Sequence, residues 1–160
     1  MPTEHEACLL LGSNIRADHY LPRAVKLLRK QGKIVRASSV WETPAVGSNG
    51  PNFLNAAVLV LTSLEVQALK DELLHPIEAE LGRVRTADKN APRSIDIDLI
   101  FFDGILLEPH LWDYAFRAIP VAEILPDAIS PAGDTLKDVA AQLALTSPIR
   151  IRADVSLVKQ

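Results

Sequence analysis

The sequence has one cysteine, few aromatic residues and no long apolar run, and each shortage excludes a class of protein. A lone Cys8 cannot form a disulfide within the chain, which excludes a secreted scaffold built on disulfides. No apolar run approaches the roughly 20 residues that span a membrane. Aromatic residues make up 5% of the chain and the net charge is −3, so the stacking residues and basic surface of a nucleic-acid-binding domain are also missing.

What remains predicts a globular protein of the cytoplasm. Glu4 and Glu6 stand where a secretory signal would carry positive charge, so no export signal is expected. With 48% hydrophobic and 23% charged residues, the composition is that of an ordinary folded domain. We therefore expect residues 1–160 to form a single domain, with no nucleic acid, no membrane and no evident protein partner.

The spacing of apolar residues predicts an α+β fold with a ferredoxin-like core. Strands are expected at 8–11, 34–41, 53–61 and 95–102. One helix follows the first strand, and a second amphipathic helix runs from Val66 to Leu81. This order is the split βαβ arrangement, a mainly antiparallel sheet with helices on its faces. A proline-rich stretch and a further helix at 136–145 form a C-terminal extension.

Particular residues are expected to bound the two core helices. Asp18 is placed to cap the first helix, and Gly32 to end it. Thr62 and Glu65 have the spacing of a capping box ahead of the second helix. Pro76 lies within that helix and is expected to kink it, because proline removes a backbone hydrogen-bond donor.

Two carboxylates, Asp96 and Asp98, lie two positions apart on the fourth predicted strand. Successive side chains of a strand point to opposite faces, so the two share one face roughly 7 Å apart. Such pairs are often only solvated surface charges. Here the strand continues into the apolar run at 99–102, so carboxylates at its start are expected to be paired or metal-bound. They suit Mg²⁺, which completes its coordination with substrate phosphates.

Three arginines, Arg83, Arg85 and Arg93, precede this acidic pair. Guanidinium groups bind phosphate oxygens through paired hydrogen bonds. The alternative is a set of surface salt bridges, worth about 0–1 kcal/mol each. Pro92 restricts the backbone directly before Arg93, which favours a role in aiming its guanidinium. Carboxylates for a metal and arginines for an anion together predict phosphoryl transfer.

A loop rich in proline and glycine, at 43–52, leads into the third predicted strand. On that strand Phe53 and Asn55 share a face and place an aromatic ring beside an amide. The pair suits a flat heterocycle with hydrogen-bonding groups. The alternative is simple core packing for Phe53 and a turn for Asn55.

Taken together and in order, these motifs resemble the 6-hydroxymethyl-7,8-dihydropterin pyrophosphokinase family (2-amino-4-hydroxy-6-hydroxymethyldihydropteridine diphosphokinase). The resemblance runs from about residue 9 to residue 127. The segments that carry it are Leu11-Gly12-Ser13-Asn14, Ser38-Ser39, Trp41-Glu42-Thr43-Pro44, Asn52-Phe53-Leu54-Asn55-Ala56, Ile77-Glu78, Gly82-Arg83-Val84-Arg85, Pro92-Arg93-Ser94-Ile95-Asp96-Ile97-Asp98 and Pro120-Val121-Ala122-Glu123-Ile124.

The resemblance implies a folate-pathway enzyme that uses ATP and two Mg²⁺ ions. The pterin hydroxymethyl oxygen would attack the β-phosphorus of ATP, giving AMP and the pterin diphosphate. By position, the metal ligands would be Asp96 and Asp98, joined as catalytic residues by Arg83 and Arg93. The pterin would contact Thr43, Pro44, Val46, Phe53, Asn55 and Phe116. ATP would contact Glu78, Arg85, Arg93, Leu99 and His110.

The chain departs from the family pattern between Asp98 and Phe116, where it is several residues shorter. Tyr114 stands at the position of a family arginine, and Arg117 is expected to substitute for it in part. A catalytically weak or inactive module that binds pterin or nucleotide is therefore the alternative to the enzyme.

Overall fold

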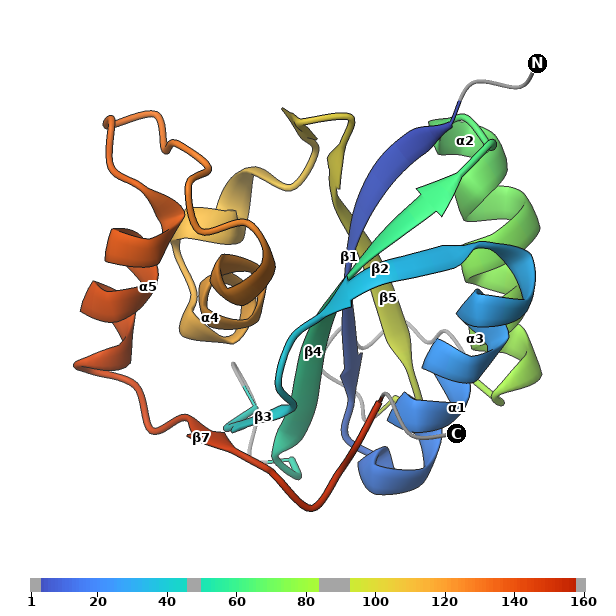
Figure 1. The fold of residues 1–160 in the computed structure, drawn as a ribbon. Coiled ribbons are helices and arrows are strands. Elements are labelled where there is room, and N and C mark those ends of the chain that lie inside the picture. The colour runs from blue at the N-terminus through green and yellow to red at the C-terminus, as the bar shows by residue number, and fades with distance from the viewer. Residues whose placement is uncertain (1–3, 46–49, 84–92, 158–160) are drawn as a thin grey trace.

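The computed structural model describes residues 4–45, 50–83 and 93–157, which form an antiparallel sheet with helices on both faces (Figure 1). The strands are β1 (His5–Ser13), β2 (Lys33–Ala37), β3 (Trp41–Thr43), β4 (Phe53–Thr62), β5 (Asp96–Phe102), β6 (Ile105–Leu106) and β7 (Arg150–Ile151). Along the sheet the order is β6-β5-β1-β4-β3-β7, and β2 also pairs with β4.

This strand order confirms the ferredoxin-like prediction. β1 and β4, the first strands of the two βαβ halves, lie side by side at the centre. Each half places its second strand against the first strand of the other half, so β2 pairs with β4 and β5 pairs with β1. This interleaving is the split βαβ arrangement.

Different helices cover the two faces of the sheet. The helices are α1 (Ala17–Gln31), α2 (Val66–Leu69), the π-helical η1 (Lys70–Leu74), α3 (His75–Glu80), the 3₁₀-helix η2 (Pro109–Trp112), α4 (Ala115–Ile124) and α5 (Leu136–Ala144). α1 and the α2-η1-α3 stretch cover one face, and α4 and α5 lie over the other (Figure 1). Within the described ranges no helix is both long and apolar enough to cross a membrane.

β5 is buried on both faces, as its apolar sequence predicts. Leu99 pairs with Leu9 and Phe101 pairs with Cys8, so Ile100 is the extra residue of a β-bulge. The bulge lets Ile100 and Phe101 both face the core under α4 and α5, while Leu99 faces the core under α1 and α3. The alternation before the bulge leaves Asp96 and Asp98 on the α4–α5 face.

The predicted cap of the first helix is wrong. α1 begins at Ala17, one residue before Asp18, and its N-cap is Arg16. The carbonyl of Arg16 accepts hydrogen bonds from the amides of His19 (2.9 Å) and Tyr20 (3.0 Å), so the first turn is already formed around Asp18. At the other end Gly32 follows the last helical residue, as predicted.

The predicted capping box of the second helix is also wrong. Thr62 is the last residue of β4, and its Oγ1 accepts a hydrogen bond from the amide of Leu64 (3.1 Å). The helix begins at Val66, with Glu65 as an N-cap that makes no side-chain cap bond. The distortion expected at Pro76 takes the form of η1, a wider π-helical turn directly before the proline.

Two further elements differ from the sequence predictions. The expected strand at 34–41 is divided, because Oγ of Ser38 accepts a hydrogen bond from the amide of Ala57 (2.8 Å) and so replaces a backbone rung between β2 and β3. α4 lies in the proline-rich stretch, where no helix is predicted. Pro120 removes one helical hydrogen bond, but α4 buries Ala118 and Val121 in the core and so offsets that loss.

The turn between β5 and β6 also fixes the start of β1. Asp103 and Gly104 both have positive φ angles (49° and 80°), as a tight hairpin turn requires. The Asp103 carboxylate accepts a hydrogen bond from the amide of Glu6 (2.9 Å) and lies 2.6 Å from Nδ1 of His5. That hydrogen bond raises the pKa of His5 above its ordinary value, and Glu65 adds to the rise against the effect of desolvation.

Protonated His5 is therefore expected to stabilise the fold, because the folded chain holds the proton more tightly than the unfolded chain. The stabilisation is complete below about pH 6.5 and is lost as the pH rises through the raised pKa of the folded state. Urea denaturation should give a higher free energy of unfolding near pH 6 than near pH 8.5. In His5→Gln this difference should shrink, and an undiminished difference would contradict the assignment.

Candidate active site

The sheet register places a row of polar side chains on the α4–α5 face. Gly12 of β1 pairs with Asp96 of β5 on one side and with Asn55 of β4 on the other. Leu10 and Ala57, two positions back along their strands, belong to the core under α4 and identify the face. Neighbouring strands are about 4.8 Å apart, so Asp96 and Asn55 are separated by about 10 Å. Because residue 12 is glycine, no side chain of β1 stands between them.

The position of Asn55 depends on Gly12. A Cβ atom at residue 12 would lie 2.8 Å from Oδ1 of Asn55. Asn55 is 5% exposed, and its Nδ2 donates a hydrogen bond to Oγ1 of Thr43 (2.8 Å). The buried amide is thus fixed between β1 and β3.

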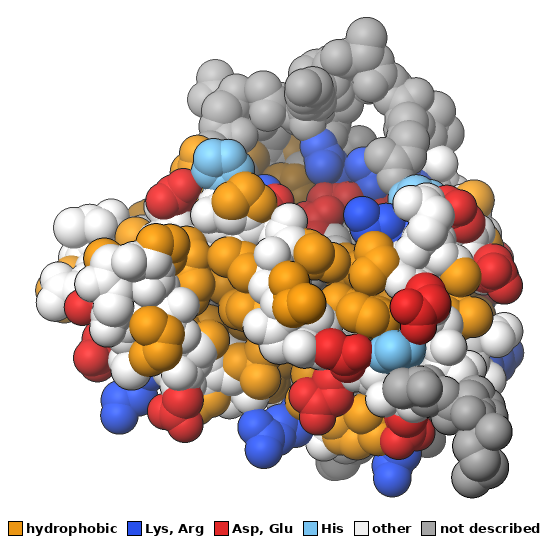
Figure 2. Space-filling model, turned by 90° about the horizontal axis from the view of Figure 1, so that it is seen from above, with side chains coloured by type: hydrophobic (Ala, Val, Ile, Leu, Met, Phe, Trp, Pro, Cys, Tyr) orange, Lys and Arg blue, Asp and Glu red, His pale blue; other side chains and the backbone are white. Residues whose placement is uncertain are grey.

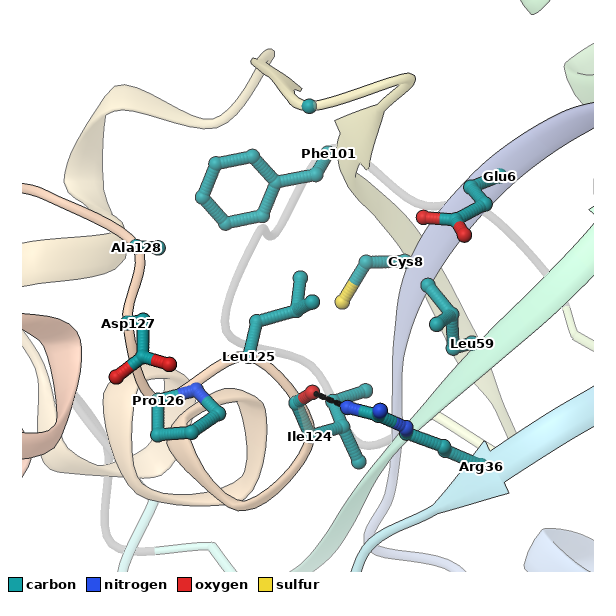
Figure 3. A pocket seen from close by; sticks show the side chains of 11 residues that line it. Glu6, Cys8, Arg36, Leu59, Phe101, Ile124, Leu125, Pro126, Asp127 and Ala128 are labelled. Carbon is teal, nitrogen blue, oxygen red and sulfur yellow. Dashed lines mark hydrogen bonds between the residues drawn. The ribbon is translucent and has the colours of Figure 1, made fainter.

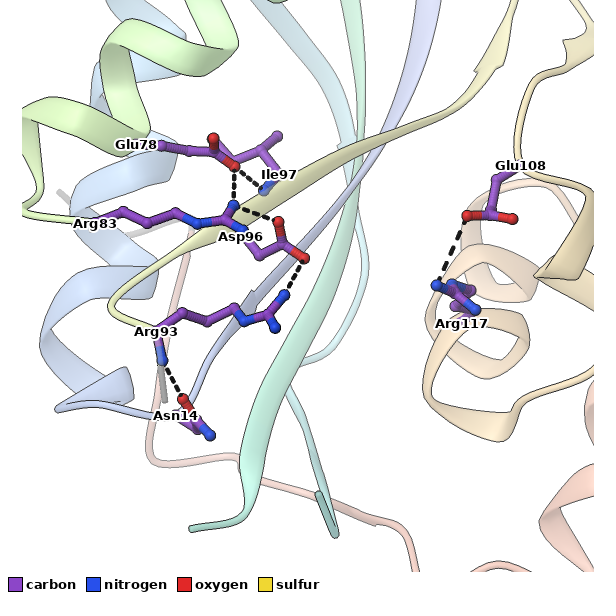
Figure 4. A network of polar contacts seen from close by, with 8 residues as sticks. All are labelled: Asn14, Glu78, Arg83, Arg93, Asp96, Ile97, Glu108 and Arg117. Carbon is purple, nitrogen blue, oxygen red and sulfur yellow. Dashed lines mark hydrogen bonds and ion pairs between the residues drawn. The ribbon is translucent and has the colours of Figure 1, made fainter. Parts of the chain in front are cut away.

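At the other end of the row, Asp96 binds two arginines (Figure 4). Nη1 of Arg83 lies 2.6 Å from Oδ1 of Asp96, and Nη1 of Arg93 lies 3.3 Å from Oδ2. The structure therefore brings together one of the two predicted carboxylates and two of the three predicted arginines. Arg85 lies outside the described residues.

Glu78 of α3 supports this cluster through contacts with Arg83 and with the backbone of β5. Its Oε2 accepts hydrogen bonds from Nη1 of Arg83 (2.8 Å) and from the amide of Ile97 (2.8 Å). β6 pairs with β5 only at the far end of that strand, so this carboxylate covers an edge amide of β5. The sequence predicts that Glu78 contacts ATP. The structure leaves only 4% of its side chain exposed and places it where it orients Arg83.

Asn14 is a supporting residue to which sequence reasoning gives no role. Its amide donates to the carbonyl of Arg93 (3.1 Å), and its Oδ1 accepts from the amide of Arg93 (2.7 Å). This double connection pins the approach to β5 against the end of β1. Its one sequence signal is its place in the segment Leu11-Gly12-Ser13-Asn14.

Asp98 lies beside Asp96 on the same face but in a drier environment. Burial raises the pKa of the Asp98 carboxyl to about 7, and the negative charge of Asp96 adds to the rise, whereas Arg117 opposes it. Two carboxylates that repel each other in this way fit a divalent cation. Among the described residues no three metal-binding side chains form a cluster. Mg²⁺ needs only one or two carboxylates when phosphates complete its shell, so the pair suffices.

The start of α4 forms the opposite wall of the site. The guanidinium carbon of Arg117 lies 4.9 Å from the ring centre of Phe116 and 5.5 Å from that of Tyr114. Its Nη2 lies 3.6 Å from Oε1 of Glu108 (Figure 4). A guanidinium is thus present on this wall, near Tyr114, and its charge reaches Asp98.

A cavity of about 330 Å³ lies between β3, the start of α4 and the end of α5. Thr43, Pro44 and Phe116, three residues predicted to bind the pterin, are among those that line it. Phe53 pairs with Thr43 across β3 and β4, and Asn55 binds Thr43. The structure therefore gathers these five residues at one end of the sheet.

Other predicted contacts are not brought into this arrangement. Leu99 is 7% exposed and faces the core under α1 and α3, away from Asp96 and Asp98. His110 lies on η2, where its Nδ1 is 2.9 Å from Oδ2 of Asp113. Val46 lies outside the described residues.

A second cavity, of about 300 Å³, lies at the far end of α4 (Figure 3). Cys8, Phe101 and Leu125 line it, and Arg36 at its edge donates a hydrogen bond to the carbonyl of Ile124 (2.9 Å). Burial raises the pKa of the Cys8 thiol to about 12, so it is not a nucleophile at neutral pH.

In the view from above, hydrophobic side chains gather across the middle of the visible face, with charged side chains around them (Figure 2).

The protein is thus a ferredoxin-like domain that carries carboxylates and arginines at one end of a sheet face and a cavity of about 330 Å³ at the other. The chain belongs to the 7,8-dihydro-6-hydroxymethylpterin-pyrophosphokinase family, whose model matches residues 8–126.

Curated relatives agree with this membership, and a solved structure shares the fold. The chain is 37% identical to the 2-amino-4-hydroxy-6-hydroxymethyldihydropteridine pyrophosphokinase of Methylorubrum extorquens. The match runs over 149 residues and covers 86% of this chain and 92% of the relative. It is 34% identical over 139 residues to the mitochondrial folate synthesis bifunctional protein of Arabidopsis thaliana, which covers 79% of this chain but only 24% of that longer protein. A crystal structure of Plasmodium falciparum HPPK-DHPS matches the fold with a TM-score of 0.68 at 14% identity, over 88% of this chain and 44% of that one.

Removing the Glu78 carboxylate is expected to destabilise the fold, because it leaves a buried amide without its acceptor and Arg83 with one partner fewer. Glu78→Ala should lower the free energy of unfolding by about 3 kcal/mol, as when one partner of a buried ion pair is lost. Glu78→Gln keeps the size and an acceptor for the Ile97 amide, so it should lose less. Urea denaturation measures both, and a loss below about 0.5 kcal/mol in Glu78→Ala, typical of surface sites, would contradict this role.

Proposed function

We propose that the chain transfers the diphosphate of ATP to the hydroxymethyl group of 6-hydroxymethyl-7,8-dihydropterin, a step of folate biosynthesis. The hydroxymethyl oxygen bonds to the β-phosphorus, and the bond from that phosphorus to the bridging oxygen of AMP breaks. The products are the pterin diphosphate, AMP and the hydroxyl proton. The observation that carries the proposal is the row Asp96-Gly12-Asn55, in which a carboxylate bound by two arginines and a buried amide share one face of the sheet. Family membership supports the same activity.

Asp96 and Asp98 would hold the phosphate end of ATP through Mg²⁺, two ions by the family resemblance. When bound, Mg²⁺ neutralises phosphate charge and favours the ionised form of both carboxylates. The short strand segment that carries them is rigid, because β1 pairs with it and Glu78 covers its edge. The carboxylates therefore need little rearrangement to meet the ions.

Arg83 and Arg93 have different parts in this scheme. Arg83 is fixed by short contacts to Glu78 (2.8 Å) and Asp96 (2.6 Å), so it acts as a stationary positive charge. The contact of Arg93 with Asp96 is longer (3.3 Å), so a phosphate oxygen can compete for that guanidinium. Charge that develops on the transferred group would be stabilised by Arg93.

The pterin would lie at the Asn55 end of the row. A flat ring fits between aromatic side chains, here Phe53 of β4 and Phe116 of α4, while the buried amide of Asn55 offers both a donor and an acceptor. Thr43 and Pro44 close the edge of this cavity. The hydroxymethyl group would then point along the row toward Asp96.

The direct test is an assay with ATP, Mg²⁺ and the pterin that separates AMP from ADP by chromatography. AMP formation that depends on the pterin supports the proposal. AMP formation without the pterin, or ADP as the nucleotide product, would refute diphosphoryl transfer. Pterin binding without any AMP would instead support the inactive binding module.

Asp98→Asn is expected to abolish AMP formation without unfolding the chain. Because burial disfavours the ionised carboxyl, the variant free of metal should be at least as stable as the wild type near pH 8. Activity is measured with saturating substrates, and stability by urea denaturation with a chelator present. The matched control is Asp71→Asn on the exposed surface of η1, which should retain full activity. Near-normal turnover of Asp98→Asn would remove Asp98 from the metal site.

Asn55→Ala and Arg93→Ala are expected to impair opposite ends of the site. Loss of the Asn55 amide should raise the KM for the pterin about 10- to 100-fold, the effect of one or two buried hydrogen bonds, and leave the KM for ATP nearly unchanged. Loss of Arg93 should lower kcat by a factor that corresponds to about 3 kcal/mol of lost transition-state stabilisation, similar to the loss of other preorganised donors. Steady-state kinetics with each substrate varied gives both values. The reverse pattern would overturn the assignment of the two ends.

A further inference from the structure

The segment after α5 crosses to the other side of the sheet and ends beside α1 (Figure 1). Residues 150–157 form this C-terminal strap. It begins as β7, which pairs with β3, and it ends with Val155 and Leu157 buried in the core under α1. Nη2 of Arg29 on α1 donates a hydrogen bond to the carbonyl of Leu157 (3.0 Å). The strap lies beyond residue 126, where the match to the family model ends.

Glu42 of β3 is the polar centre of the contact between strap and sheet. Its Oε1 accepts hydrogen bonds from Nη2 of Arg150 (2.9 Å) and Nη1 of Arg152 (3.1 Å). Asp154 holds the other edge of the Arg152 guanidinium through two hydrogen bonds of 2.8 Å and so aims it at Glu42. The second carboxylate oxygen, Oε2, accepts from Nδ2 of Asn52 (3.0 Å). Glu42 thus joins three separate parts of the chain.

Two of these parts are the ends of the loop that precedes β4. Glu42 comes directly before Thr43, and Asn52 comes directly before Phe53. Oγ1 of Thr43 in turn accepts the hydrogen bond from the buried Asn55 amide (2.8 Å). A displacement of Glu42 is therefore transmitted to Thr43 through one peptide bond, and from Thr43 to Asn55 through one hydrogen bond.

We propose that the C-terminal strap positions the pterin-binding end of the sheet, with Glu42 and Arg152 as positioning residues that touch neither substrate. This rests on the proposed function. The Glu42 and Arg152 side chains are shielded, at 16% and 28% exposure, whereas Arg150 is 72% exposed. Removing Arg152 should therefore displace Glu42 more than removing the exposed Arg150.

The ATP end of the site has separate supports. Arg83 is held by Glu78, and the backbone of Arg93 is held by Asn14. A polar cavity of about 200 Å³, lined in part by Asn14, Glu42 and Arg152, lies between that anchor and the strap. Breaking the contact between Arg152 of the strap and Glu42 should therefore change pterin recognition and leave ATP recognition in place.

The experiment is steady-state kinetics on Glu42→Gln, Arg152→Gln and the double variant, with each substrate varied. Each single variant should raise the KM for the pterin about 10-fold and leave the KM for ATP and kcat within about twofold of wild type. The double variant should be no worse than either single variant, since both break the same contact. Two independent effects would multiply to about 100-fold instead.

The matched control is Arg29→Gln, which loosens the same strap at Leu157 without touching Glu42. Thermal unfolding of all four variants shows how much stability each has lost. Arg29→Gln should lose stability comparable to that lost by Arg152→Gln and keep the wild-type KM for the pterin. This separates positioning from general destabilisation.

Three outcomes would overturn the proposal: an unchanged pterin KM in Glu42→Gln and Arg152→Gln, an equal rise in Arg29→Gln, or a parallel rise in the KM for ATP. If the wild type itself neither binds the pterin nor forms AMP, the proposed function fails and the strap's role fails with it. An active wild type with unaffected variants refutes the strap's role alone.

Discussion

The site depends on the absence of a side chain at Gly12 of β1. β1 is the strand to which both β4 and β5 pair, so whatever stands at position 12 separates Asn55 from Asp96. A methyl group there would already collide with the Asn55 amide. Glycine at this position therefore lets the Asn55 amide lie against β1 and leaves no β1 side chain between the two ends of the row. Every other contact in the site supports one end or the other.

The helix layer over this face has two opposing effects. α4 closes an apolar core against β1, β4 and β5, and it carries Phe116 and Arg117 to the rim of the site. The same burial makes the Asp98 carboxyl costly to ionise, which the nearby Arg117 only partly corrects. An acidic group at the edge of a hydrophobic core is stabilised in its ionised form by any positive charge placed beside it. The burial that stabilises this helix layer is thus also what makes the Asp98 carboxylate favour a nearby positive charge.

Sequence reasoning succeeded where a property is local. The alternation of a strand is enough to place Asp96 beside Asp98, and Phe53 beside Asn55, and the apolar runs locate the core strands. It failed where contacts join distant segments: nothing near Glu78 in the sequence indicates that it covers the amide of Ile97. The backbone anchor at Asn14 and the joint at Glu42 have the same cause, since each depends on register between strands. α4 was missed because Pro120 lies inside it and disguises a helix that burial stabilises.

The interleaving of the two βαβ halves has a consequence for how the protein becomes functional. The central strand β1 pairs with β4 and with β5, the two strands of the second half, so the defining contacts join residues far apart in the chain. Proteins with such high contact order gain their stabilising contacts late in folding. A nascent chain has no partial version of this arrangement, because β5, which carries Asp96 and Asp98, is the last core strand to leave the ribosome. The row Asp96-Gly12-Asn55 therefore exists only after the whole core has been synthesised and paired.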